Sequence, residues 1–443
     1  MRIIKATKTV SILLAVWLVL ITFTVHPVAA QQAPTQKDAG SGEDSEPVYP
    51  EKVRSRAAWE YVVNLPGYIL YLPFWLVYSA VMPVIGLADT SNILPRIKDF
   101  LVSDDGKRMA FPMYESQYGL GMVYSQRGLF TPQCELQIGG MMGLWWRRYF
   151  SVEVKRFALG GPVHAGIGGH YMLWTDAAFF GIGNDTQKSD RTNFAHRQPS
   201  MWASVGLDLG KRLSGDFAVR FERNAISEGR NPNFGSTTDW LRDRGETLPG
   251  LEGRAEYLAM DLKLEHFSLI QGERSAGGWA LRGGASLYDQ LNGDAYNFYK
   301  GYLDVTRYIH LFYGRTLALR AAFEVSRPYK DGEVPFYYLS RLGRRETIRG
   351  YTRDRYHDRD SALYSVEYRY PLIKRPSGNP SMNAILFVDW GKVSPNLFND
   401  PFFKGYHTSY GGGFRIFDRK NLNLSFLVAK SRDGYRVYLL FNQ

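Results

Sequence analysis

The stretch Asn421-Leu-Asn-Leu-Ser-Phe-Leu-Val428 alternates polar and apolar side chains. Because successive side chains of a β-strand point to opposite faces of a sheet, its apolar residues share one face and its polar residues the other. The stretch Ala362–Tyr370 alternates in the same way, with Glu367 and Arg369 on its polar face. Both stretches therefore predict strands that have one apolar and one polar face.

This period of two returns from about Arg108 to the end of the chain. Bacterial single-chain barrels have even numbers of strands, so we expect sixteen. One strand is not apparent, and it would lie between Thr186 and Pro199 or within Val163–Asp185. The other fifteen begin near Gln117, Cys134, Tyr149, Val163, Met201, Asp216, Ala255, Gly278, Asn297, Arg315, Ala362, Asn383, Tyr406, Asn421 and Tyr435.

Alternation alone does not separate a membrane barrel from a soluble β-sandwich, whose polar face lies in water. Three features favour the barrel: an export signal, strands of about ten residues where soluble strands have about five or six, and strand ends rich in Tyr, Trp and Phe. A composition of 15% aromatic residues, 22% charged residues and 44 glycines also fits one large barrel. We therefore expect an all-β transmembrane protein of the bacterial outer membrane.

Residues 1–30 have the plan of a cleaved signal peptide. Basic residues precede an apolar core, Val10–Val25, and the small residues Ala29 and Ala30 come just before Gln31. A retained membrane anchor is the alternative. Cleavage would remove three positive charges from the net charge of +11 and leave +8. Cys134 is the only cysteine of the chain, so an intramolecular disulfide is impossible.

Two segments precede the barrel, which we place at residues 108–443. Residues 31–58 lack apolar periodicity and read as a disordered linker. Residues 59–107 contain an apolar run, Tyr61–Leu87, that is interrupted by prolines and glycines. These breaks favour an amphipathic segment that associates with the membrane or plugs the barrel, over a straight spanning helix.

Three motifs in order resemble the BamA/TamA outer-membrane β-barrel superfamily, also called the bacterial surface antigen family. They are Arg341-Leu-Gly-Arg-Arg-Glu-Thr-Ile-Arg-Gly-Tyr-Thr-Arg353, Glu367-Tyr-Arg-Tyr-Pro371 and Phe387-Val-Asp-Trp-Gly391. The resemblance implies that a lid loop, Gly332–Asp360, folds into the lumen of the 16-stranded antiparallel barrel. The interrupted apolar run predicts a short helical segment before the barrel. Phe179–Thr186 also looks like a strand end of this family.

The resemblance implies a lock between the lid and the barrel wall. In that family the arginine of an Arg-Gly-aromatic tip meets acidic residues of the next two strands, which here would be Glu367 and Asp389. The tip would be Arg349, Gly350 and Tyr351. Alternation independently places both carboxylates on polar strand faces, and a guanidinium can bind carboxylates with two parallel hydrogen bonds. The alternative is that Arg349 is an ordinary arginine on a solvated loop.

Sequence motifs of enzymes are missing. The chain has no Gly-x-Ser-x-Gly elbow, no His-Glu-x-x-His site and no phosphate-binding Gly-x4-Gly-Lys loop. His164 and His170 share a strand face, but six residues along a strand separate them by about 20 Å, too far to bind one ion. We therefore expect ordinary lumenal histidines, no catalytic residue, no metal and no cofactor.

The expected function is non-covalent and concerns outer-membrane biogenesis, protein insertion or translocation, or lipid homeostasis. Residues 31–107 do not read as the periplasmic POTRA domains of the family's assembly proteins. Weak pairing at the seam between the first and last strands is expected from Gly119 and Gly121, and from the strand Tyr435–Phe441, which resembles the C-terminal signal of barrel-assembly clients. The partners would be outer-membrane lipids, the barrel-assembly machinery and possible protein clients or periplasmic proteins, with no nucleic acid. A passive pore or small-molecule transporter is the alternative.

Overall fold

The structure, a computed structural model, describes residues 101–443 except 104, 116, 211, 252, 269–276, 375–379, 402–403, 418–422 and 443. The predicted signal peptide (1–30), linker (31–58) and most of the amphipathic segment (59–107) lie outside the described residues. Within the described ranges, no helix combines the length and the hydropathy that a membrane crossing needs.

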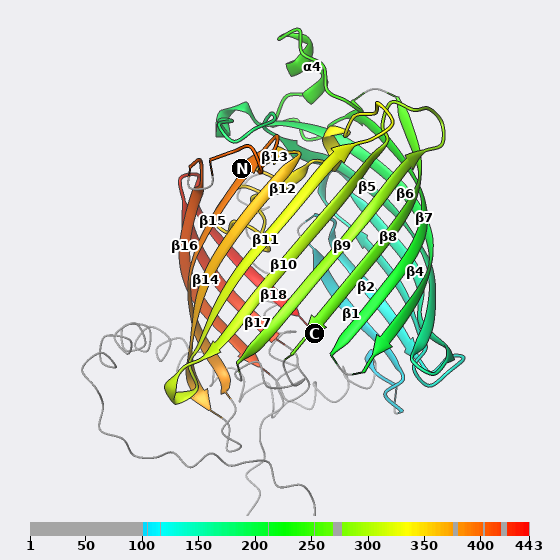
Figure 1. Cartoon of the computed structure of the whole chain (residues 1–443), viewed down its shortest axis with the longest axis vertical. Helices are drawn as coiled ribbons and strands as arrows, with labels where there is room; N and C mark the ends of the chain where they lie inside the picture. The colour runs from blue at the N-terminus through cyan, green and yellow to red at the C-terminus, as the bar shows by residue number, and fades with distance from the viewer. Residues whose placement is uncertain are drawn as a thin grey trace, which may run out of the picture. The chain divides into compact units, whose positions relative to one another are not determined.

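Sixteen antiparallel strands form one sheet, and they follow the chain order except that β11 pairs with β14. They wind around a central space as tilted strands (Figure 1). The prediction of sixteen strands is confirmed. The strands are β1 (Arg108–Glu115), β2 (Gly119–Arg127), β3 (Glu135–Met142), β4 (Arg148–Gly160), β5 (Val163–Phe179), β6 (Thr192–Leu209), β7 (Leu213–Glu228), β8 (Arg254–Phe267), β9 (Gly278–Gln290), β10 (Phe298–His310), β11 (Thr316–Pro328), β14 (Asp360–Lys374), β15 (Pro380–Ser394), β16 (His407–Phe417), β17 (Asn423–Ser431) and β18 (Gly434–Asn442).

The sixteenth strand lies where the sequence did not indicate it. It is β1. Of the two regions suggested for it, Val163–Asp185 contains only β5, and Thr186–Pro199 contains the beginning of β6, at Thr192. The sequence of β1, Arg-Met-Ala-Phe-Pro-Met-Tyr-Glu, has apolar residues on both faces, so it lacks the contrast that marks a period of two. Pro112 cannot donate to a ladder, but a strand at the end of the sheet order tolerates this loss.

Apolar side chains cover the outer face of the strands. On β6, the exposed residues Met201, Val205, Leu207 and Leu209 share one face, and the intervening side chains turn inward. The inward side includes charged groups, such as Arg220 on β7, which donates to Asp261 on β8 at 3.1 Å. This arrangement suits a barrel that has lipid outside and a polar wall inside.

Strand length differs around the sheet. β5, β6 and β7 have 17, 18 and 16 residues, whereas β1, β2 and β3 have 8, 9 and 8, and β18 has 9. In an antiparallel sheet, the connections that leave odd-numbered positions in the strand order all lie at one end, here called the loop end. These include the β1–β2, β5–β6, β11–β14 and β17–β18 connections. The short helix α4 (Thr237–Arg242) lies in the β7–β8 connection at this end (Figure 1).

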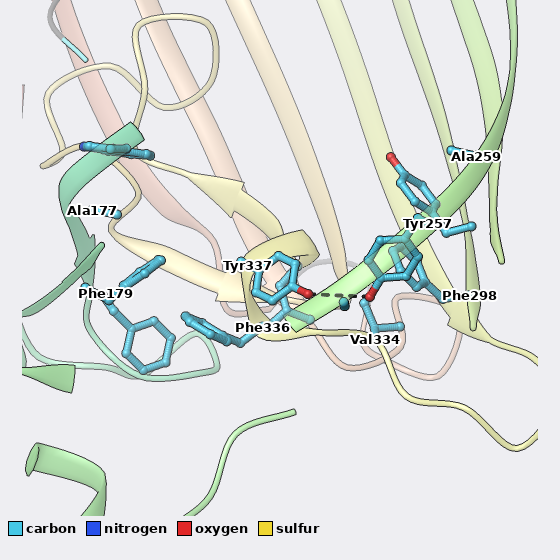
Figure 2. Close-up of a cluster of buried hydrophobic side chains, with 13 residues drawn as sticks. Ala177, Phe179, Tyr257, Ala259, Phe298, Val334, Phe336 and Tyr337 are labelled. Atoms are coloured by element: carbon cyan, nitrogen blue, oxygen red, sulfur yellow. Dashed lines mark hydrogen bonds between the residues drawn. The ribbon is translucent and has the colours of Figure 1, made fainter. Parts of the chain in front are cut away.

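The connection between β11 and β14, residues 329–359, is here called the lumen loop. It contains the 3-10 turn Phe336–Tyr338 and two short strands that pair with each other, β12 (Ser340–Leu342) and β13 (Tyr356–Asp358). Its aromatic residues Phe336 and Tyr337 pack in a buried cluster with side chains of β5, β6, β8, β9 and β10 (Figure 2). A hydrophobic core of the protein therefore lies inside the barrel.

Candidate functional site

The tip of the lumen loop, residues 343–355, projects from the β12–β13 pair. Leu342 and Tyr356 are partners in that pair, so the chain must turn back sharply beyond them. Gly343 begins the turn with φ +104°, and a Cβ on it would lie 2.2 Å from the carbonyl oxygen of Thr352. Only glycine fits this position, because the conformation and the space both exclude a side chain.

Arg349 binds carboxylates of two adjacent strands. Its Nε and Nη2 donate to the two oxygens of Asp389 on β15 at 2.8 and 2.6 Å, and its Nη1 donates to Glu367 on β14 at 3.0 Å. Its backbone N–H also donates to Asp389, at 3.1 Å. The guanidinium lies 3.5 Å from the centroid of the Phe387 ring. The structure thus brings the three predicted residues of the lock into contact.

These charges are almost fully buried. Arg349 and Glu367 are each 8% exposed, and Asp389 is 0% exposed. Neighbouring groups complete the network, since Ser365 donates to Asp389 at 2.7 Å and Arg369 donates to Glu367 at 2.8 Å. A buried ion pair whose partners are all hydrogen-bonded depends on each of its members, because removal of one leaves an uncompensated charge.

Gly350 and Tyr351 contact other parts of the wall. Gly350 has φ +87°, and its N–H donates to the Tyr438 hydroxyl of β18 at 2.9 Å. The Ser431 hydroxyl of β17 donates to the carbonyl of Gly350 at 2.8 Å. Tyr351 is 3% exposed and donates to the carbonyl of Thr408 on β16 at 3.2 Å. The three residues of the tip motif therefore contact five consecutive strands, from β14 to β18.

The base of the lumen loop contacts the opposite wall. The Tyr338 hydroxyl accepts hydrogen bonds from Gln198 on β6 at 3.2 Å and from Asn224 on β7 at 3.1 Å. Lys300 on β10 donates to the carbonyl of Tyr338 at 2.8 Å. The Tyr337 and Tyr257 hydroxyls are 3.5 Å apart. A dashed line joins them in Figure 2. The loop is thus held from both sides of the lumen.

The β5–β6 connection crosses to the same region. Residues of the Phe179–Thr186 motif reach the loop and the far wall: the N–H of Gly183 donates to the carbonyl of His357 at 2.8 Å, and the N–H of Val393 on β15 donates to the Asn184 side chain at 3.1 Å. Asn184 also pairs through its carbonyl with the His407 ring, at 2.8 Å. This motif therefore packs against the lumen loop.

Arg355 is a site residue that the sequence did not distinguish from the other arginines of the loop. It is 0% exposed and donates to the hydroxyl of Thr186 at 2.7 Å. Its Nε lies 3.4 Å from Asp433, in the β17–β18 connection. Its partners are 169 and 78 residues away in the chain, so no local pattern could have identified it.

Asp354 is a second site residue that the sequence did not single out, and it pairs with two arginines of the lumen loop. It is 0% exposed, and Arg344 donates to it at 2.5 Å, while Arg341 lies 3.7 Å away. Burial alone would raise the pKa of Asp354, but Arg344 and Arg341 hold it well below the usual range. Burial lowers the pKa of the adjacent His357 to about 3, helped by the charge of Arg341. His357 is therefore neutral at physiological pH.

The predicted seam glycines are not on the first strand. Gly119 and Gly121 lie on β2, because β1 precedes them. A Cβ on Gly121 would lie 1.9 Å from the carbonyl oxygen of Gly140, so this glycine allows β2 and β3 to approach closely. On β18, Tyr435 is exposed, and Phe441 lies within the strand. β1 and β18 end the strand order, and the described residues show no pairing between them.

The two strand histidines have separate surroundings. His164 lies 3.7 Å from Asp216, and His170 packs between Tyr149 and Trp202. Among the residues that the structure describes, no group of three or more His, Cys, Asp or Glu side chains could hold a metal ion.

The Omp85 superfamily domain matches residues 272–422, which include β9 to β11, the lumen loop and β14 to β16. Among solved structures, BamA from Haemophilus ducreyi lacking POTRA domains 1–3 is similar with a TM-score of 0.54 at 14% identity, over 75% of this chain and 67% of that chain. No curated protein sequence matches. The BamA likeness shows a common barrel fold.

Two further structures have lower scores. CdiB from Acinetobacter baumannii aligns with a TM-score of 0.43 at 10% identity over 74% of this chain, and CdiB from Escherichia coli with 0.47 at 11% over 75%. The chain spans 57% and 60% of the length of those two proteins.

Proposed function

Because this chain is an outer-membrane β-barrel of the BamA/TamA-type Omp85 superfamily, we propose that it acts non-covalently in the biogenesis of that membrane. It would insert or translocate proteins, or maintain the lipid content, at the seam between β1 and β18. The observation that carries this proposal is that the lumen loop is bound to both sides of the wall, through Tyr338 to β6 and β7 and through Arg349 to β14 and β15. Because the lumen loop lies across the lumen, a protein client or a lipid would be handled at the seam and not through the lumen.

The short strands at the seam support this location. Eight residues of β1 rise about 27 Å along the strand and, at a tilt of about 40°, cross about 20 Å, which is less than an apolar band of about 25 Å. The 18 residues of β6 extend well beyond such a band. Lipid beside the seam would therefore be compressed, and compressed lipid lowers the cost of moving a strand or a lipid molecule through it.

The partners of such a protein would be outer-membrane lipids and possible protein clients or periplasmic proteins. The barrel-assembly machinery would insert the barrel itself, with β18 as the signal strand. A passive pore, the competing function, needs a free path through the lumen. The contacts of the lumen loop with both walls argue against one.

The test compares cells that lack the protein with cells that express it or its Arg349→Ala variant. We expect loss of the protein to change the amounts of outer-membrane proteins or the phospholipid exposed at the cell surface, and the wild type to restore both. Purification from native membranes with bound lipids and proteins would then identify the clients. If loss changes only the uptake of small solutes, the pore is the correct function.

A further inference from the structure

The two strands that border the seam end in hairpins at the loop end. The β1–β2 connection, residues 116–118, follows Glu115, and the β17–β18 connection, residues 432–433, follows Ser431. Within the described part of the chain, no backbone pairing joins β1 to β18. Whatever connects the two hairpins must therefore come from side chains or from another segment.

The tip of the lumen loop binds the last hairpin through a dense set of contacts. Besides the bonds of Gly350 to Tyr438 and Ser431, the N–H of Thr352 donates to Asp433 at 3.4 Å, and Arg436 donates to the Thr352 hydroxyl at 2.7 Å. Arg355 adds its ion pair with Asp433, in which the two side chains are 0% and 3% exposed. Water is largely excluded from this contact.

The same tip binds the first hairpin through Arg353, which is two residues before Arg355. Arg353 Nη1 lies 3.6 Å from Glu115 at the end of β1, and its Nη2 donates to the Gln117 side chain. Arg345 lies 3.8 Å from the same Glu115 carboxylate. The side chains of Arg353, Glu115 and Arg345 are 29%, 30% and 38% exposed, so water reaches this contact.

We propose that residues 350–355 form a clasp across the seam, and that the clasp releases the first hairpin before the last one. Exposed ion pairs are weak and are screened by salt, whereas a buried network breaks only if several hydrogen bonds are lost together. Opening would therefore separate β1 and β2 from the tip, while the lumen loop, β17 and β18 move as one body. This inference rests on the proposed function at the seam, and it adds the order in which the two hairpins separate from the tip.

Hydrogen exchange on the full-length protein in lipid nanodiscs tests the order of release. Arg353→Gln removes the charge that faces the first hairpin, and Asp433→Asn weakens the contact with the last one. Lys330→Gln is the matched control, because Lys330 forms an exposed ion pair with Asp289 at the other end of the same loop, at 2.7 Å.

We expect Arg353→Gln to raise exchange in Arg108–Glu115 about threefold, and to leave Gly434–Asn442 at the wild-type rate. Asp433→Asn should raise exchange in Gly434–Asn442 and in residues 343–355 together. The control should match the wild type in all three segments. High salt should reproduce the effect of Arg353→Gln in the wild type.

Two outcomes would overturn the clasp. In one, Arg353→Gln leaves the exchange of Arg108–Glu115 unchanged although the barrel is folded, as heat-modifiability shows. In the other, either substitution raises exchange in both end strands equally, so that there is no order of release. The proposed function fails separately, if cells without the protein keep normal outer-membrane proteins and surface lipids.

Discussion

At the scale of single residues, we expect replacement of Arg349 to destabilise the lumen loop strongly, because Arg349 binds two buried carboxylates. Arg349→Ala would leave Glu367 and Asp389 without their shared partner, which costs about 3–5 kcal/mol for a buried pair. We expect a lower temperature for heat-modifiability on gels and a loop that is cut by protease in the folded barrel. Arg349→Lys should restore both only in part, since an ammonium group lacks the planar fork of donors.

Glu367→Gln should act in the same direction as Arg349→Ala, because it removes charge from the same network. Lys330→Gln serves again as the control, since it changes an exposed pair of the same loop. The lock would be refuted by an Arg349→Ala protein that unfolds at the wild-type temperature and keeps its loop protected.

His357 makes the lumen loop sensitive to acid. Its pKa is lowered to about 3 in the folded protein, so the folded state resists the proton that the unfolded segment accepts near pH 6.5. Stability is therefore full above about pH 6.5 and falls as the pH drops toward 3, by up to about 1.4 kcal/mol per pH unit. The charges of Arg341, Arg344 and Arg355 add to this lowering of the pKa, and the carboxylate of Asp354 opposes it.

Asp358 opposes this effect. Burial raises its pKa to about 6, so the folded state favours its protonated form, and its contribution to stability is lost as the pH rises through 6. Between pH 7 and 5 the contributions of the two residues to stability therefore change in opposite directions. On going from pH 7 to pH 5, protease protection of the loop should therefore decrease more in Asp358→Asn than in the wild type, and less in His357→Gln than in the wild type. Equal acid sensitivity in all three proteins would disprove this assignment.

At the scale of elements, we expect the lumen loop to determine whether the barrel conducts. Its contacts with β6, β7, β14 and β15 leave it across the lumen, so the intact protein in planar bilayers should show small, intermittent currents. Replacement of residues 333–358 by a short Gly-Ser turn should give large, steady currents, because the walls would enclose water. Large currents from the intact protein would favour the pore function.

Some strands and site residues could be predicted from the sequence, and others could not. Alternation predicted the strands whose two faces differ, and the Arg-Gly-Tyr motif with its downstream carboxylates indicated which residues would meet. The strand β1 was not predicted, because it has apolar residues on both faces. Arg355 and Asp354 were not predicted, because their roles depend on burial and on partners that the local sequence does not reveal. In the sequence, Arg355 is one of seven arginines in the lumen loop.

At the scale of the whole molecule, the continuous hydrogen-bonded ladders of the sixteen-stranded sheet predict resistance to detergent. The protein should fractionate with the outer membrane after cleavage near Ala30 and should migrate differently on gels before and after boiling, because unboiled samples keep their sheet. Recovery in the soluble periplasmic fraction would contradict both the location and the fold.

The single cysteine provides a built-in reporter for the part of the barrel nearest the seam. Cys134 is 0% exposed, and its carbonyl accepts a hydrogen bond from Gly128 across the β2–β3 connection, at 2.7 Å. Its thiol can react with a maleimide only when this connection comes apart. The rate of labelling therefore times the closure of the second and third strands during assembly, and no residue has to be replaced for the measurement.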